Sequence, residues 1–165
     1  MRMLTITVLV SLCLPLKAAI VPAPGPETGL EVSILAAAPV QWALAQIESG
    51  HYRNPDTAKG SSGEVSRFQI MPSVWKTYSK SRNYSNPILA WNVAHQILEE
   101  RESWFVRATG RRPTAFDLYV MWNKPGLYEK VGFNPRRLPQ KVREVANRFE
   151  NLVLAIRLAP LSEAR

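Results

Sequence analysis

Apolar residues recur at intervals of three and four positions along most of the chain, the spacing that gathers them on one face of a helix. From Glu31 to Ser49 this pattern includes Val40 and Leu44, and Gly50 follows as a stop signal. Pro39 lies inside the segment, so we expect it to kink the helix or to begin a second one.

The same spacing predicts further helices downstream. One begins near Pro72, and others are expected at 86–107, 114–122 and 138–158. Residues 51–66 are polar and contain one proline and two glycines, which indicates a loop or a short hairpin. The sequence therefore predicts a mainly α single domain over residues 31–158, with a small loop or β-hairpin lobe.

Both ends of the chain differ from this central part. Arg2 precedes an apolar run from Met3 to Leu16, and Ala18 offers a small residue for cleavage, which is the plan of a secretory signal peptide over residues 1–18. The run is shorter than the roughly 20 apolar residues of a membrane-spanning helix. Residues 19–30 are rich in proline and glycine and predict a linker, and residues 159–165 predict a short tail.

Composition and charge agree with an exported globular domain. The 165 residues are 46% hydrophobic and 21% charged, which excludes a wholly disordered chain. Cleavage after Ala18 would remove two of the 21 basic residues and no acidic one, so the net charge would fall from +8 to +6. It would also remove Cys13, the only cysteine, so the mature protein would have no internal disulfide. The basic excess favours an anionic partner.

The motifs of several common sites are missing from the sequence. It has no phosphate-binding glycine loop, no paired-histidine metalloprotease helix and no nucleophilic serine flanked by glycines. His51 and His95 are the only histidines, and the mature chain would have no thiol, so we expect no metal and no cofactor. Acid or base chemistry is then expected from a carboxylate.

Glu48 is the carboxylate whose position is unusual. It lies on the apolar face of its predicted helix, one turn after Leu44 and close to the C-terminal end. Burial and the helix dipole both disfavour negative charge there, so both should raise the pKa of Glu48 toward the value that a general acid needs. We therefore expect Glu48 to be catalytic.

Four short blocks stand out in the sequence. They are Glu48-Ser49 at a helix end, Gln69-Ile70-Met71-Pro72 after a glycine-containing loop, Asn86-Pro87 with Asn92, and Trp122-Asn123 before Gly126. In this order they resemble the lytic transglycosylase domain of the soluble lytic transglycosylase (SLT) type, within the lysozyme-like superfamily. They cover roughly residues 34–128. In the family, the last block usually begins with a tyrosine followed by asparagine.

The resemblance implies a lysozyme-like fold with the loop lobe beside an active-site cleft. It also implies cleavage of the β-1,4 bond between N-acetylmuramic acid and N-acetylglucosamine in peptidoglycan without water. Glu48 would act first as acid and then as base, leaving 1,6-anhydromuramic ends. The chain departs from the family at Glu64, within Gly63–Gln69, and at Trp122, which stands where a tyrosine usually orients the glutamate.

Further residues are expected to contact the glycan. The resemblance implies roles for a serine, an amide, a thioether and an asparagine beside the glutamate. Aromatic side chains in or near the loops are expected to stack on sugar faces. The predicted substrate-binding residues are Ser49, Gln69, Met71, Phe68, Trp122, Asn123 and Tyr128, with Tyr52 as an additional stacking residue.

Two other functions remain open at this point. A lysozyme-type hydrolase would use water, with Asp56 or Glu64 as a second carboxylate. A non-catalytic protein would bind an anionic partner through a basic patch in and just before its last helix, made of Arg136, Arg137, Lys141, Arg143 and Arg148.

The signal peptide and the resemblance together predict the location and the partners. We expect a monomer secreted across the inner membrane into the periplasm or cell envelope of a bacterium. Its partners there would be the glycan strands of peptidoglycan, with a cell-envelope secretion machine as a further candidate. Export argues against a nucleic-acid partner.

Overall fold

The computed structural model describes residues 29–159, with side chains from Ala37 onward. The described part is mainly helical, which confirms the predicted class. The predicted signal peptide, residues 19–28 of the predicted linker and residues 160–165 lie outside it. The α-helices are α1 (Gly29–Ser49), α2 (Pro72–Tyr78), α3 (Pro87–Thr109), α4 (Ala115–Asn123), α5 (Pro125–Lys130) and α6 (Gln140–Leu158), with single 3-10 turns at Pro55–Thr57 and Pro135–Arg137.

The helices differ from the sequence prediction most clearly at the start of α1 and at α5. Helix α1 begins at Gly29, inside the stretch predicted as linker, and continues through Pro39 as one helix. Helix α5 was not predicted, because the sequence around it indicated only a break. It begins at Pro125, and proline at the first helical position is favoured since the missing N–H would have no partner there.

Local signals explain where the long helices begin and end. The Asn86 side chain accepts a hydrogen bond from the Leu89 N–H at 2.9 Å and so caps α3, as its sequence predicts. Thr114 and Asp117 form a capping box at the start of α4. Gly110 ends α3 with a φ of 72°, a left-handed conformation that glycine adopts without strain.

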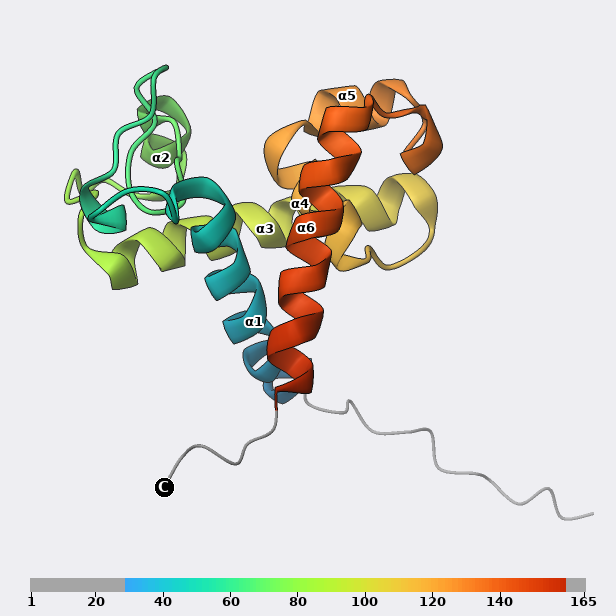
Figure 1. The fold of residues 1–165 in the computed structure, drawn as a ribbon, viewed down its shortest axis with the longest axis horizontal. Coiled ribbons are helices and arrows are strands. Elements are labelled where there is room, and N and C mark those ends of the chain that lie inside the picture. Colours follow the sequence, from blue (N-terminus) through green and yellow to red (C-terminus); the bar gives the residue numbers. More distant parts are fainter. Residues whose placement is uncertain (1–28, 160–165) are drawn as a thin grey trace, which may run out of the picture.

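The helices pack around α6 and α3. Helices α1 and α4 both contact α6, and α4 also contacts α3. In Figure 1, α1 and α6 lie side by side, while α3 passes behind them and connects the loop lobe and α2 on one side with α4 and α5 on the other. The largest fully buried side chains include Trp75, Phe105, Tyr128, Phe149 and Leu44.

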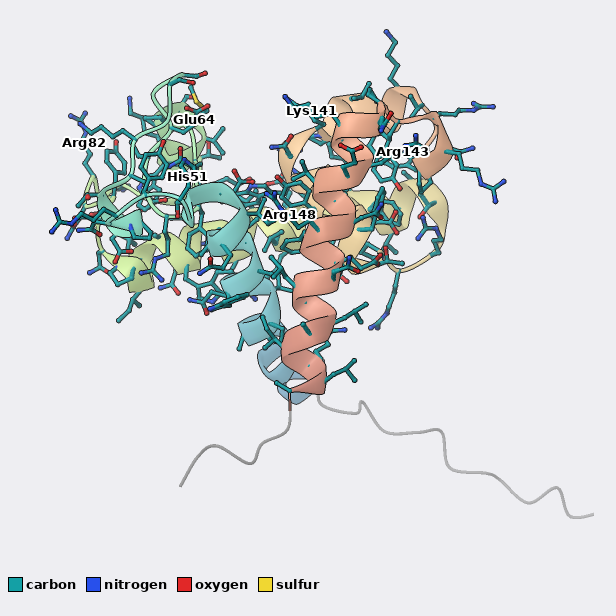
Figure 2. All side chains as sticks on the ribbon, viewed as in Figure 1. His51, Glu64, Arg82, Lys141, Arg143 and Arg148 are labelled. Atoms are coloured by element: carbon teal, nitrogen blue, oxygen red, sulfur yellow. The ribbon has the colours of Figure 1, made fainter. Side chains whose placement is uncertain are left out.

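Helix α6 turns its apolar side to the core and its charges to the surface. Phe149 and Val153 are buried, whereas Lys141 and Arg148 are exposed, and Figure 2 shows the basic side chains along the helix. The basic residues therefore form the solvated back of a core helix. Within residues 29–159, no helix combines the length and the apolar character needed to cross a membrane.

The lobe between α1 and α2 is a loop. Its only β-type pairings in the described structure are the isolated antiparallel bridges Lys59–Val65 and Val65–Ile70. The Ser49 hydroxyl, at the end of α1, donates a hydrogen bond of 2.8 Å to the Arg67 carbonyl and ties the lobe to the helix. This connection places the lobe beside the C-terminal turn of α1.

Asp117 is the buried acidic residue that organises the opposite side of the molecule. Its carboxylate is 2% exposed and accepts hydrogen bonds from Arg111 at 2.6 and 3.2 Å, from the Thr114 N–H at 2.9 Å and from the Tyr128 hydroxyl. Burial alone would raise the pKa of Asp117, but the hydrogen bonds from Arg111, Tyr128 and Thr114 outweigh it and hold the pKa below its ordinary value. The network joins α4, α5 and the α3–α4 turn.

Asp117→Ala should lower the free energy of unfolding by about 3 to 5 kcal/mol, because it leaves the Arg111 guanidinium and the buried Tyr128 hydroxyl without their acceptor. Since the folded-state pKa is depressed, the contribution of Asp117 is present above its unfolded pKa of about 3.8 and is lost as the pH falls through the lower folded value. Urea unfolding at pH 7 and under acid conditions measures both effects.

The matched control is Asp56→Ala, which removes the partly exposed ion pair with Arg67. It should cost no more than about 1 kcal/mol. Equal losses for the two variants would contradict the role assigned to Asp117.

Candidate active site

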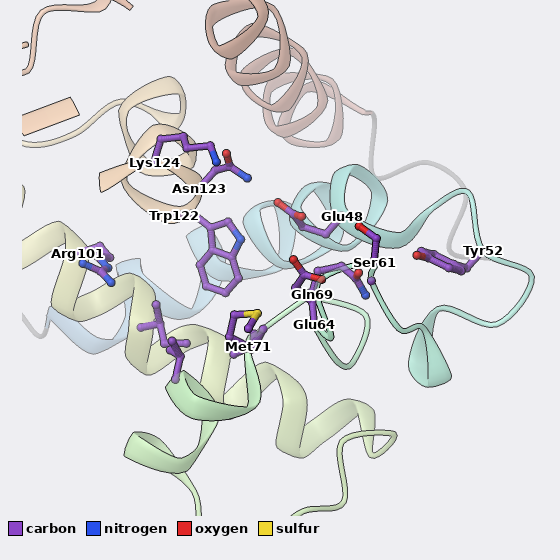
Figure 3. Close-up of a pocket in the computed structure, with 14 residues that line it drawn as sticks. Glu48, Tyr52, Ser61, Glu64, Gln69, Met71, Arg101, Trp122, Asn123 and Lys124 are labelled. Carbon is purple, nitrogen blue, oxygen red and sulfur yellow. The ribbon is translucent and has the colours of Figure 1, made fainter. Parts of the chain in front are cut away.

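A cleft of about 430 Å³ opens between the loop lobe and helices α2, α3 and α4 (Figure 3). Its volume falls within the usual range of ligand pockets, roughly 300 to 1,000 Å³. Helix α1 contributes Glu48 from its last turn. The other lining residues are Tyr52, Gly60, Ser61, Glu64, Gln69, Ile70, Met71, Val74, Ile97, Arg101, Trp122, Asn123 and Lys124.

Glu48 has the electrostatic environment that its sequence position predicts. The pKa of Glu48 is raised from 4.5 to about 7. Burial is the largest cause and the nearby Glu64 carboxylate adds to it, while hydrogen bonds from Tyr119 and Trp122 partly offset both effects. Near neutral pH the side chain therefore exists in both protonation states. A carboxyl group poised in this way is able to give up a proton and take one back.

Tyr119 is the site residue that sequence reasoning missed. Its hydroxyl donates a hydrogen bond of 3.2 Å to Oε1 of Glu48, and its ring packs against Phe149 in the core. Burial and the neighbouring Glu48 raise the pKa of Tyr119 well above its ordinary value, so the hydroxyl remains a donor. The available signal was its position one helical turn before Trp122 on α4.

Trp122 and Tyr119 both approach Glu48 from helix α4. Trp122 lines the cleft, and its side chain also hydrogen bonds to Glu48. Figure 3 shows its ring next to Glu48. The phenolic hydroxyl that contacts the glutamate therefore comes from one turn earlier on the same helix.

The loop lobe presents Gln69 to the cleft through a strained turn. Ser66 and Gln69 have φ values of 66° and 49°, which side-chain-bearing residues rarely adopt. The turn is closed by backbone hydrogen bonds between Val65 and Ile70, and Nε2 of Gln69 donates to the Ser66 carbonyl at 3.0 Å. Strain of this kind is concentrated at functional sites.

Gly60 leaves space for two polar side chains of the cleft. A Cβ at this position would lie 2.2 Å from a carboxylate oxygen of Glu64 and 2.6 Å from Oε1 of Gln69. Any larger residue would displace both groups, so glycine permits their present positions. Glu64 also accepts a hydrogen bond from the Ser62 N–H at 3.0 Å, which holds its carboxylate at the lobe.

The structure brings several predicted ligand-contacting residues to the cleft and excludes others. Gln69, Met71, Asn123 and Tyr52 line it with Trp122. The Tyr52 hydroxyl donates to the Lys59 carbonyl at 3.0 Å, which fixes the ring against the lobe. Met71 is exposed at the entry to α2.

The expectations for Phe68, Tyr128 and Ser49 are corrected. Phe68 and Tyr128 are fully buried, so neither ring offers a face to a sugar. Phe68 packs near Trp91, and Tyr128 packs against Phe105 while its hydroxyl bonds to Asp117. Ser49 is also fully buried, and its hydroxyl is used in tying the loop to α1.

The structure places only one of the two candidate second carboxylates in the cleft. Glu64 lines the same cleft as Glu48 and raises its pKa. Asp56 does not line the cleft and is paired with Nε of Arg67 at 2.5 Å. A mechanism that needs a second carboxylate would therefore use Glu64.

No three histidine, cysteine, aspartate or glutamate side chains within the described residues gather closely enough to hold a metal ion. Glu48 and Glu64 are the carboxyl groups that line the cleft, and Glu48 is the one with a raised pKa and with Tyr119 and Trp122 as hydrogen-bond donors.

Tyr119→Phe should raise the pKa of Glu48 above about 7. The hydroxyl hydrogen bonds to the charged carboxylate and stabilises it, so its removal favours the protonated form. The pKa is measured by following the side-chain carboxyl carbon of Glu48 by NMR during a pH titration. Tyr52→Phe is the matched control, because its hydroxyl bonds to Lys59 instead, and an unchanged or lower pKa in Tyr119→Phe would refute the assignment.

Glu48→Gln should make the protein more stable than the wild type at pH 8. With a pKa of 4.5 when unfolded and about 7 when folded, Glu48 keeps its proton longer in the folded state, so wild-type stability falls as the pH rises between these values. The full difference corresponds to at most about 3 kcal/mol. Urea unfolding from pH 4 to 8 measures it.

The exposed Glu129 on α5 provides the control for that comparison. The stability difference between Glu48→Gln and wild type should grow with pH, while the difference for Glu129→Gln should not. Parallel stability curves for Glu48→Gln and the wild type would show that the Glu48 carboxyl is not desolvated in solution.

Comparisons with known proteins do not assign this chain to a family. No family model matches it, and neither the curated proteins nor the solved structures compared with it gave a match.

Proposed function

We propose that this protein is a lytic transglycosylase that cleaves peptidoglycan at the β-1,4 bond between N-acetylmuramic acid and N-acetylglucosamine. The observation that carries the proposal is the position of Glu48 at the cleft, with burial raising its pKa to about 7 and the Tyr119 hydroxyl holding Oε1 at 3.2 Å. The four sequence blocks described above supply the substrate class.

In the first step, protonated Glu48 gives its proton to the oxygen that links the two sugars. The bond from C1 of the muramic acid to that oxygen breaks, and the N-acetylglucosamine leaves with a hydroxyl group. The positive charge that develops at C1 is taken up by the carbonyl oxygen of the sugar's own acetamido group. A pKa near 7 supports this step, because a large share of Glu48 is protonated at neutral pH.

In the second step, the Glu48 carboxylate removes the proton from the C6 hydroxyl of the muramic acid. The C6 oxygen then bonds to C1 and the acetamido group is released, which closes a 1,6-anhydro ring. Glu48 is protonated again and no water is consumed. Tyr119 and Trp122 support this step because their hydrogen bonds favour the carboxylate form.

Other cleft groups would position the glycan. Gln69 and Asn123 offer amide groups for sugar acetamido and hydroxyl groups, and Trp122 offers a ring for an apolar sugar face. The proposed fold is lysozyme-like, with the loop lobe of residues 50–71 as one wall of the cleft. In this proposal the protein is a monomer exported to the cell envelope, where glycan strands and a secretion machine are its partners.

A lysozyme-type hydrolase is the second candidate, and the position of Glu64 in the cleft favours it. Its carboxylate lines the cleft and is close enough to Glu48 to raise the pKa of that residue. In a hydrolase, Glu64 would activate water or stabilise the sugar cation while Glu48 acts as the acid. The products would then carry reducing ends.

Digestion of purified peptidoglycan followed by mass spectrometry of the muropeptides distinguishes the two reactions. We expect wild-type products with 1,6-anhydromuramic ends, which are one water lighter than reducing ends. Glu48→Gln should lose at least about a hundredfold in rate, because general acid–base catalysis contributes roughly 10² to 10⁴. Glu64→Gln should keep forming anhydro products.

The hydrolase would instead be established if the wild type formed only reducing ends and if both Glu48→Gln and Glu64→Gln lost this activity. Full activity in Glu48→Gln would exclude both mechanisms. Asp56→Asn serves as the control for removal of a lobe carboxylate outside the cleft.

A further inference from the structure

Two cationic side chains line the cleft, and neither forms an ion pair with a residue that the structure describes. Arg101 on α3 and Lys124 at the α4–α5 junction both contribute to its wall. Figure 3 shows them on one side of the Trp122 ring, with Glu64 and Gln69 on the other side. The cleft thus carries positive charge at one end and carboxylates at the other.

The Arg101 side chain is held in place by a neighbouring ring, but one of its nitrogen atoms has no hydrogen-bond partner. Its guanidinium lies 5.5 Å from the centre of the Trp104 ring, which restricts its orientation. Its Nε is buried and has no hydrogen-bond partner among the described residues, an arrangement that is rare for a buried polar atom. The neighbouring Glu100 carboxylate accepts the Tyr78 hydroxyl instead.

Lys124 is held by its backbone and not by its side chain. Its N–H donates to the Val120 carbonyl at 2.8 Å, and its carbonyl accepts from the Tyr128 N–H at 3.0 Å. The exposed ammonium group makes no hydrogen bond or ion pair with any described residue. Helix α3 and the α4–α5 junction therefore present two cations without ion-pair partners to one end of the cleft, where an anionic group of a ligand would be attracted.

We propose that Arg101 and Lys124 form a subsite for a carboxylate on the lactyl arm of muramic acid, an inference that rests on the proposed function. The planar guanidinium matches a carboxylate through paired N–H donors, and the ammonium adds a second charge. The subsite would select muramic acid polymers over uncharged N-acetylglucosamine polymers. It assigns substrate discrimination to two residues to which the sequence blocks gave no role.

The carboxylate has two sources in the polymer. A peptide stem carries carboxylates on its acidic and terminal residues, whereas removal of the stem leaves the free lactyl carboxylate on the sugar. Three tetrasaccharides separate these cases. The first carries peptide stems, the second has had them removed, and the third is an N-acetylglucosamine tetramer without any carboxylate.

The experiment measures binding on a Glu48→Gln background, so that turnover does not interfere. Arg101→Gln combined with Lys124→Gln should weaken binding of a carboxylate-bearing tetrasaccharide about tenfold relative to the N-acetylglucosamine tetramer, the change expected for loss of about 1.4 kcal/mol. Calorimetry gives the dissociation constants. The control is Arg107→Gln with Lys130→Gln, which removes equal charge from exposed positions on α3 and α5 outside the cleft.

A loss confined to the stem-bearing ligand supports recognition of the peptide, and a loss for both muramic ligands supports recognition of the arm at the sugar. The proposal would be overturned if the double variant bound all three ligands with equally reduced affinity or with unchanged affinity. It would also be overturned if the control variant showed the same loss, or if the Glu48→Gln protein bound no muramic ligand. Lys124→Gln alone provides the test if loss of Arg101 packing unfolds the double variant. Failure of the proposed function appears separately, as wild-type digests without anhydro ends.

Discussion

Desolvation of one carboxyl group is the constraint on which the site depends. Glu48 lies where helix α1 meets the loop lobe and α4, and burial raises its pKa to about 7. The hydrogen bonds from Tyr119 and Trp122 work in the opposite direction and limit that rise. The balance leaves a group that exchanges a proton near neutral pH, which is the property that a single acid–base catalyst needs.

The wall opposite α4 depends on backbone conformations that cost free energy. Ser66 and Gln69 are held at positive φ by the pairing of Val65 with Ile70 and by the bond from Ser49 to the Arg67 carbonyl. These contacts keep the Gln69 side chain beside Glu64 above Gly60. The buried serine of the Glu48-Ser49 pair thus acts on the site through the loop and does not itself reach the cleft.

The proposed selectivity of the cleft arises from its charge distribution. Glu48 and Glu64 occupy the region of α1 and the lobe, whereas Arg101 and Lys124 come from α3 and the end of α4. These residues lie far apart in the sequence, and the fold brings them to one cleft. A polymer that alternates neutral sugars with acid-bearing sugars would be able to contact both regions at once.

Periodicity and local signals in the sequence determined most of the helices but not α5, together with the starts of two helices near Asn86 and Thr114 and the position of Glu48 on an apolar face near a helix end. Those features depend on residues within a turn or two of each other. Only the tertiary structure decided that Tyr119 contacts Glu48, that Phe68 and Tyr128 belong to the core, and that Glu64 faces the cleft while Asp56 does not. An aromatic ring or a carboxylate has the same local preferences whether it faces a cleft or the core, so packing between distant segments makes that choice.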